Sequence, residues 1–164
     1  MLKQLIILRG LPGSGKSKVA EDYKKKHHDS CIIISTDNYW YRPDGLYDFK
    51  YDLLGRAHEW TKQKAKMTME FESKHYNNYD SVIIIDNTNM SFQEMKPYIL
   101  MGLKYKFEIK FEEPKTAWRY DVISCHLRQD KNISLPTMYG FVKHFEPEEV
   151  VLEKFRKLVI NENY

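Results

Sequence analysis

The 164-residue sequence predicts an α/β fold with a mainly parallel sheet of four to five strands and helices on both faces. Three observations predict this class. Short apolar runs alternate with longer amphipathic segments, a glycine-rich turn joins the first such pair, and polar residues end several of the apolar runs. Because no internal repeat or low-complexity tract interrupts the alternation, we expect a single domain over residues 1–164.

The first half of the chain contains two predicted strands and two predicted helices. We expect a buried strand over residues 4–8, an amphipathic helix over 17–26 and a second strand over 31–35. Turn-forming residues then predict an irregular loop over 41–49. A long helix is expected from about residue 51 to 76, so the strand–helix alternation continues into the middle of the chain.

The second half of the chain continues the same alternation. The apolar run 82–85 predicts a third strand, and Ser91 is suited to cap a helix that runs to about residue 104. The remaining predicted elements are a strand over 105–111, a helix over 116–128, and two terminal helices that begin near Pro136 and Pro147.

The turn between the first strand and the first helix has the spacing of the P-loop, GLPGSGKS at residues 10–17. Its glycines allow successive amide groups to turn towards phosphate oxygens at a helix N-terminus. The lysine of this motif reaches the outer phosphates of a nucleotide triphosphate, and the hydroxyl that follows is a ligand for Mg²⁺. We therefore expect ATP and Mg²⁺ as cofactors, with Ser17 as the metal ligand. The residues expected to hold the nucleotide are Gly10, Pro12, Gly13, Ser14, Gly15, Lys16, Ser17, Lys18 and, from the far end of the chain, Lys131.

Polar residues end the second and third predicted strands at the same sheet edge as the P-loop. Asp37 follows the second strand, and Asp86 ends the third with Asn89 close behind. One carboxylate at a strand end is usually a turn former, but two beside a P-loop favour phosphoryl transfer, which needs a base and positive charge. We predict that Asp37 is the base and that Arg128 and Lys131 supply the charge. Arg128 has a structural alternative, since a basic residue also stabilises a helix C-terminus.

Composition and charge exclude several classes of protein. No apolar run is long enough to span a bilayer, and the N-terminal apolar region is too short for a signal peptide. Cys31 and Cys125 are isolated in the sequence, which argues against a disulfide scaffold and against a zinc site. We expect a cytoplasmic protein, or a nuclear one in a eukaryote. The net charge of +3 is compatible with a nucleic-acid partner without requiring one.

Seven segments, taken in order, resemble the small P-loop kinase domain of the Nedd-four-binding-protein-two-like family. This family is in turn similar to the bacteriophage polynucleotide 5′-hydroxyl kinase. The seven segments are GLPGSGKS, STDNYW, DGLYDF, AHEW, IIDNTNMSFQEMKPYILMGLKY, EEPKTAWRYDV and Arg128. The resemblance runs from residue 3 to about 145. It implies a P-loop NTPase-type three-layer sandwich with a helical lid over about 124–136. It also implies ATP-dependent phosphorylation of a hydroxyl, at the 5′ end of DNA or RNA.

The resemblance assigns roles to individual residues. Lys16 and Ser17 match the residues that hold phosphates and magnesium, and Asp37 matches the general base. Arg128 matches the lid that closes over ATP. Asp86 matches the acidic residue that helps to organise the acceptor side, where we also expect Asn89.

Three positions depart from the pattern of this family. Asn38 stands where the family usually has a second acidic residue, and Trp40 stands where the phage kinase has an arginine for the acceptor phosphate. We expect either that Arg42 makes this phosphate contact or that Trp40 stacks on a base. The lid reads Arg-Gln-Asp-Lys-Asn over residues 128–132 in place of Arg-Asn-x-His-Gly, which keeps the charge but alters the sequence that shapes the lid.

The main prediction is an ATP-dependent polynucleotide 5′-hydroxyl kinase. A kinase acting on a sugar, nucleoside or antibiotic hydroxyl stays open, because the same scaffold hosts those acceptors. A nucleotide-dependent nucleic-acid-binding module without turnover also stays open. The sequence does not determine the oligomeric state or the choice between DNA and RNA.

Overall fold

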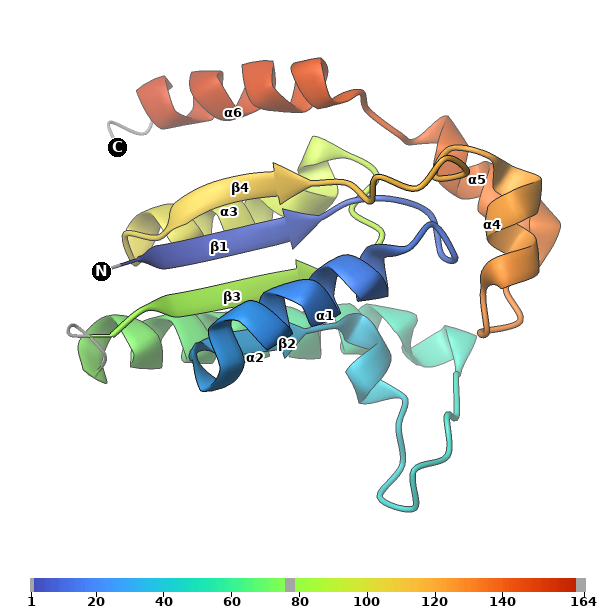
Figure 1. Cartoon of the computed structure of the whole chain (residues 1–164), viewed down its shortest axis with the longest axis horizontal. Helices are drawn as coiled ribbons and strands as arrows, with labels where there is room; N and C mark the ends of the chain where they lie inside the picture. The colour runs from blue at the N-terminus through green and yellow to red at the C-terminus, as the bar shows by residue number, and fades with distance from the viewer. Residues whose placement is uncertain (1, 76–78, 162–164) are drawn as a thin grey trace.

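A computed structural model describes residues 2–75 and 79–161, and within these residues four parallel strands form one sheet between two helical layers (Figure 1). The strands stand in the order β2-β3-β1-β4. The parallel sheet with helices on both faces is thus confirmed. The strands are β1 (Lys3–Leu8), β2 (Cys31–Ile34), β3 (Ser81–Asp86) and β4 (Glu108–Glu112).

The two central strands are continuous apolar runs because helices cover them on both faces. Ile6 in β1 and Ile84 in β3 pair in register, and both are fully buried. The same register pairs Leu8 with Asp86, so the loop that follows β1 begins beside the carboxylate that ends β3. Since β3 and β4 lie on opposite sides of β1, the carboxyl end of β1 is the switch point at which α/β sheets bind ligands.

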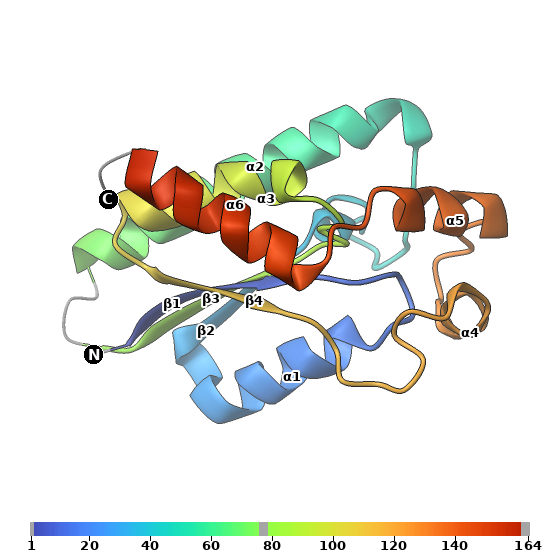
Figure 2. The same ribbon diagram turned by 90° about the horizontal axis from the view of Figure 1, so that it is seen from above.

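The helices form layers of different size on the two faces of the sheet, as Figure 2 shows. An apolar cluster that includes Ala20 joins the sheet to α1, and a larger one that includes Met69, Met95 and Val151 joins it to the opposite helices. The helix on the first face is α1 (Lys16–His27), and those on the second are α2 (Leu54–His75), α3 (Phe92–Lys104) and α6 (Glu148–Asn161).

Two shorter helices, α4 (Val122–Arg128) and α5 (Leu135–Lys143), stand beyond the carboxyl ends of the strands (Figures 1 and 2). A third apolar cluster contains Leu11 of the P-loop together with Cys125 and Met138 of these helices. The helices are therefore packed onto the loop through apolar contacts. The predicted lid over about 124–136 falls on the end of α4, the connecting turn and the start of α5.

Three predicted boundaries differ from the structure by three residues or more. The helix expected from residue 116 begins at Val122, because the hydroxyl of Thr116 donates to the Ser14 carbonyl oxygen (2.7 Å) while Asp121 caps the helix. The strand expected from residue 105 begins at Glu108, because Lys106 adopts a positive φ of 61° in the preceding turn. The long helix is preceded by a 3-10 turn over 51–53, and its expected end at 76 lies outside the described residues.

Within the described part of the chain, none of the helices combines the length and the apolar character that crossing a membrane requires.

Candidate functional site

The P-loop joins β1 to α1 in a backbone conformation that side chains rarely adopt. Gly13 and Gly15 have φ values of 77° and 106°. A methyl group at Gly13 would lie 2.1 Å from the backbone oxygen of Cys125 in α4. Glycine at this position therefore allows both the curl of the loop and the close packing of α4 against it.

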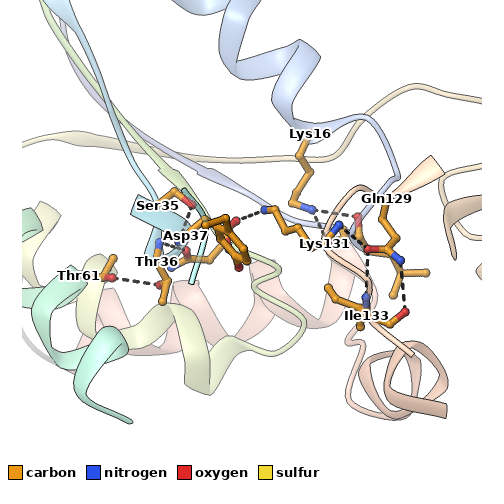
Figure 3. A network of polar contacts seen from close by, with 12 residues as sticks. Lys16, Ser35, Thr36, Asp37, Thr61, Gln129, Lys131 and Ile133 are labelled. Atoms are coloured by element: carbon orange, nitrogen blue, oxygen red, sulfur yellow. Dashed lines mark hydrogen bonds and ion pairs between the residues drawn. The ribbon is translucent and has the colours of Figure 1, made fainter. Parts of the chain in front are cut away.

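Lys16 is buried inside the curl of this loop. Its Nζ donates to the carbonyl oxygens of Gly10 and Leu11 at 2.8 and 2.9 Å. Figure 3 shows the side chain turned back toward its own loop. Burial lowers the pKa of Lys16 to about 8, and the negative charge of Asp86 opposes this shift. At neutral pH the P-loop therefore holds a cation whose present partners are backbone oxygens.

Asp37 lies in a short 3-10 helix, η2 (Thr36–Tyr39), that directly follows β2. The Asp37 amide donates to the Ser35 hydroxyl at 3.2 Å, and the Thr36 amide donates to Oδ1 of Asn87 at 2.9 Å. The Thr61 hydroxyl of α2 donates to that of Thr36 at 3.1 Å. The turn that carries Asp37 is thus held by the residue that follows β3 on one side and by α2 on the other.

Each carboxylate oxygen of Asp37 has its own partner. The Tyr47 hydroxyl donates to Oδ1 at 3.3 Å. Nζ of Lys131 donates to Oδ2, and Figure 3 shows this contact. Burial and the nearby carboxylate raise the pKa of Tyr47, so its hydroxyl stays protonated and remains a donor. Tyr47 was not among the predicted site residues. The available signal was a hydroxyl-bearing aromatic residue in the loop that follows the carboxylate.

Lys131 reaches Asp37 from the turn between α4 and α5. Oε1 of Gln129 accepts the amides of Lys131 and Ile133 at 2.9 and 3.2 Å, and Asn132 has a positive φ of 52°. The turn is therefore built by the residues that depart from the family pattern. Lys131, which was predicted to lie near the phosphates, lies at the mouth of the P-loop within electrostatic range of Lys16.

Arg128 has other partners than Lys131. Its guanidinium stacks 4.5 Å from the ring centroid of Trp118, and its Nη1 donates to the Ser124 carbonyl at 2.9 Å. The Trp118 indole in turn donates to the Gly13 carbonyl at 3.2 Å. Among the described residues of the lid, Lys131 rather than Arg128 is therefore the cation that contacts Asp37.

Asp86 and Asn89, the two polar residues at the end of β3, lie in different environments. Burial raises the pKa of Asp86, while the charges of Lys16 and Lys131 oppose this shift. Asn89 is buried, and its side-chain amide donates to the Leu8 carbonyl at 2.6 Å. The expectation that Asn89 contacts a substrate is corrected, because its amide joins the turn after β3 to the end of β1.

The expectation for Trp40 is also corrected. Trp40 is only 4% exposed and makes edge contacts with Tyr39 and Phe49 at centroid distances of 5.0 and 4.9 Å. It therefore has no free face on which a base could stack. Arg42 is exposed and pairs with Asp44 at 3.0 Å, which leaves it at the surface of the loop that follows Asp37.

Ser14, Ser17 and Lys18 of the P-loop differ in how well they are placed to bind a phosphate or Mg²⁺. Ser17 is exposed at the start of α1, and its hydroxyl together with the Asp86 carboxylate provides the oxygen donors that Mg²⁺ prefers. The Ser14 hydroxyl is buried without a hydrogen-bond partner among the described residues. The side chain of Lys18 pairs with Asp22 at 3.0 Å, and its backbone amide donates to the Gly15 carbonyl at 3.2 Å.

Sequence comparisons place these features in a known family. A family model described as an AAA domain matches residues 5–120. Human NEDD4-binding protein 2 is 39% identical over 142 residues, which are 87% of this chain and 8% of that protein. The mouse 2′,3′-cyclic-nucleotide 3′-phosphodiesterase is 33% identical over 79% of this chain and 27% of its own length. The resemblance expected from the motifs is confirmed, and the chain spans less than a third of these two relatives.

Solved structures show the same fold. A chain of the Pnkp1/Rnl/Hen1 RNA repair complex matches 93% of this chain with a TM-score of 0.62 and 20% identity, over 46% of its own length. A gluconokinase from Sinorhizobium meliloti matches 89% of this chain with a TM-score of 0.52 and 12% identity, over 77% of its own length. The chain therefore has a P-loop kinase-like fold.

Proposed function

The chain belongs to the AAA domain family, and from this premise we propose that it is an ATP-dependent polynucleotide 5′-hydroxyl kinase. The observation that carries the proposal is the contact between Asp37 and Lys131 at the mouth of the P-loop. It brings a carboxylate base and a lysine cation from the lid to the position where a terminal phosphate would project. A protein that only bound nucleotide would have no need of a carboxylate held in this position.

The nucleotide would lie with its phosphates in the P-loop. Its phosphate oxygens replace the Gly10 and Leu11 carbonyls as partners of Lys16, and loop amides bind the remaining oxygens. Ser17 and Asp86 would hold Mg²⁺, which neutralises part of the phosphate charge when bound. Lys16 then stabilises the negative charge that develops on the transferring group in a site with little water.

Transfer requires that Asp37 exchange one of its partners. The negative γ-phosphate draws Lys131 away from Oδ2, which frees this oxygen, while Tyr47 keeps hold of Oδ1. The acceptor oxygen then bonds to the γ-phosphorus as the bond from phosphorus to the ADP oxygen breaks, and the acceptor proton passes to Oδ2. The base is thus freed only when nucleotide is present.

The proposal is tested by incubating the protein with labelled ATP, Mg²⁺ and a panel of acceptors. The panel contains 5′-hydroxyl DNA and RNA oligomers, nucleosides and small sugars. We expect label on the oligomers. Label on nucleosides or sugars alone would overturn the polynucleotide assignment in favour of a small-molecule kinase.

The panel also needs a different substrate class, because one group of relatives is named for hydrolysis of 2′,3′-cyclic nucleotides. The chain covers 27% of the mouse protein, so that activity is not assigned to this segment. Hydrolysis of a 2′,3′-cyclic nucleotide without any transfer from ATP would contradict the kinase proposal.

Replacing Tyr47 with phenylalanine is expected to lower kcat roughly 5-fold, since a hydrogen bond of this kind contributes about 1 kcal/mol. Tyr47 is a positioning residue that fixes the Asp37 carboxylate through Oδ1. The variant keeps the ring and its packing, so the ATP Kd should stay unchanged and the melting temperature should fall by no more than a few degrees. Steady-state kinetics with ATP and an oligomer measure the effect.

The matched control for this change is Tyr79→Phe. It removes a hydroxyl just before β3, at the amino ends of the strands and thus at the far end of the sheet from Asp37. It should turn over like the wild type. Equal kcat values for Tyr47→Phe and the wild type would remove Tyr47 from the mechanism.

A further inference from the structure

The segment 41–51 exposes several aromatic rings beside the candidate base. Tyr41, Phe49 and Tyr51 have 54%, 49% and 81% of their surface exposed. In Figure 1 this segment is the cyan loop that projects between β2 and α2, away from the body of the sheet. Several exposed aromatic rings gathered in one short segment are typical of an interaction surface.

Two of the rings, those of Tyr41 and Phe49, are held in place although the loop has little regular structure. Phe49 packs on the buried Trp40, and Tyr41 contacts Tyr47 at a centroid distance of 5.3 Å. Tyr41 and Tyr47 also form an isolated antiparallel bridge, and the Asp48 amide donates to the Trp40 carbonyl at 2.8 Å. A preordered set of rings loses little conformational freedom on binding a ligand.

The loop also connects directly to the candidate chemistry. Tyr47, which bridges to Tyr41, donates its hydroxyl to Asp37. A polymer whose first hydroxyl reaches Asp37 must leave the site over a neighbouring surface. One neighbour of Asp37 is the turn that carries Lys131, and the other is this loop.

Two cationic residues, Arg42 and Lys50, are interspersed among the aromatic residues in the sequence, and both are exposed. Arg42 pairs with Asp44 at 3.0 Å and Lys50 pairs with Asp48 at 3.3 Å, and every partner in these pairs is at least 44% exposed. Exposed ion pairs are weak and screened by solvent, so a phosphate of a bound strand competes with the carboxylates for these cations. Alternating rings and cations are the combination that binds single-stranded nucleic acid.

We propose that Tyr41, Phe49 and Tyr51, with Arg42 and Lys50, form a platform that binds the single-stranded nucleotides following the acceptor 5′ end. This inference rests on the proposed function, and it specifies single-stranded nucleic acid as the substrate class of the kinase. Base faces stack on the rings, and phosphates meet the two cations. A duplex hides the faces of its bases, so the platform favours frayed or single-stranded ends.

The platform is tested on the whole chain with the double variant Phe49→Leu/Tyr51→Ala. Leucine keeps an apolar side chain on Trp40, and Tyr51 is largely exposed, so both changes preserve the fold. Fluorescence anisotropy with a short 5′-hydroxyl single strand should show a Kd at least about 10-fold higher than the wild type, because stacked rings contribute strongly to such binding. The ATP Kd should not change.

The matched control is Tyr79→Ala. It removes a ring that is 66% exposed and lies just before β3, at the amino ends of the strands. It should bind the strand like the wild type. A second measurement uses the wild type alone: ultraviolet cross-linking to the strand should label a peptide from residues 41–51. An unchanged Kd in the double variant, or cross-links confined to other segments, would overturn the platform.

The outcomes separate this inference from the proposed kinase activity. If the wild type binds the strand through residues 41–51 but transfers no phosphate, the platform stands and the kinase proposal fails. If the wild type phosphorylates the strand and the double variant does so with the same KM, the kinase proposal stands and the platform fails. If the wild type does not bind any single strand, the platform fails as well.

Discussion

Replacing Asp37 with asparagine should lower kcat by roughly 10²- to 10⁴-fold, the usual contribution of general-base catalysis. Asparagine keeps the size of the side chain but has no basic oxygen to accept the acceptor proton. The amides that hold the turn are unaffected, because they bind Ser35 and Asn87 rather than the carboxylate. Single-turnover transfer to a 5′-hydroxyl oligomer, measured at saturating ATP, gives the effect on the chemical step.

Other roles for Asp37 give different results. If it only forms the turn, activity and melting temperature should fall together. If it binds Mg²⁺, the affinity for ATP–Mg²⁺ should weaken along with turnover. Loss of the pair with Lys131 alone should change stability by at most about 1 kcal/mol, because both side chains are about a third exposed.

The matched control for Asp37→Asn is Asp52→Asn, an exposed carboxylate in the 3-10 turn before α2. It should turn over normally. A normal kcat in Asp37→Asn as well would exclude Asp37 as the base.

Replacing Lys16 with alanine should lower kcat/KM for ATP by at least roughly 10²- to 10³-fold, the effect of removing one preorganised charge-stabilising donor. The fold should survive. Burial lowers the pKa of Lys16, which means that the empty protein holds this cation at a cost in stability. Thermal melting without ligand should therefore show little change, because loss of the buried cation offsets loss of its bonds to the two carbonyl oxygens.

The pH dependence of ATP binding provides an independent measure of the same charge. Without nucleotide, the pKa of Lys16 is about 8, and bound phosphates raise it. Wild-type affinity for ATP should therefore be constant below about pH 8 and fall as the pH rises above it, since the neutral amine must then take up a proton on binding. The Lys16→Ala variant should lack this fall. The control Lys25→Ala, on the exposed side of α1, should keep it.

The layered fold could be predicted from sequence because its signals are local. Parallel strands covered on both faces must be apolar throughout, which makes β1 and β3 readable as runs of isoleucine, leucine and valine. The P-loop is equally local, since its spacing fixes both the curl and the helix that follows. The serine cap of α3 and the prolines near the starts of α5 and α6 were predictable for the same reason.

The wrong predictions share a physical cause, which is competition from partners distant in sequence. Thr116 was expected to open a helix, but its hydroxyl binds the carbonyl of Ser14, 102 residues away. Asn89 was expected to bind the substrate, but its amide binds the carbonyl of Leu8. Trp40 follows the candidate base and was expected to meet a substrate, but a loop that folds back onto it covers its ring. Burial of this kind depends on the path of the whole chain.

The sequence by itself determined the strands, the phosphate loop and the strand-end carboxylates, because each depends on neighbours within a few residues. Only the tertiary structure decided which groups meet Asp37. Lys131 lies 94 residues further along the chain, and it reaches Asp37 because α4 packs against Gly13 and Gln129 shapes the following turn. Arg128, three positions earlier, stacks on Trp118 because the helix turns its side chain to a different side.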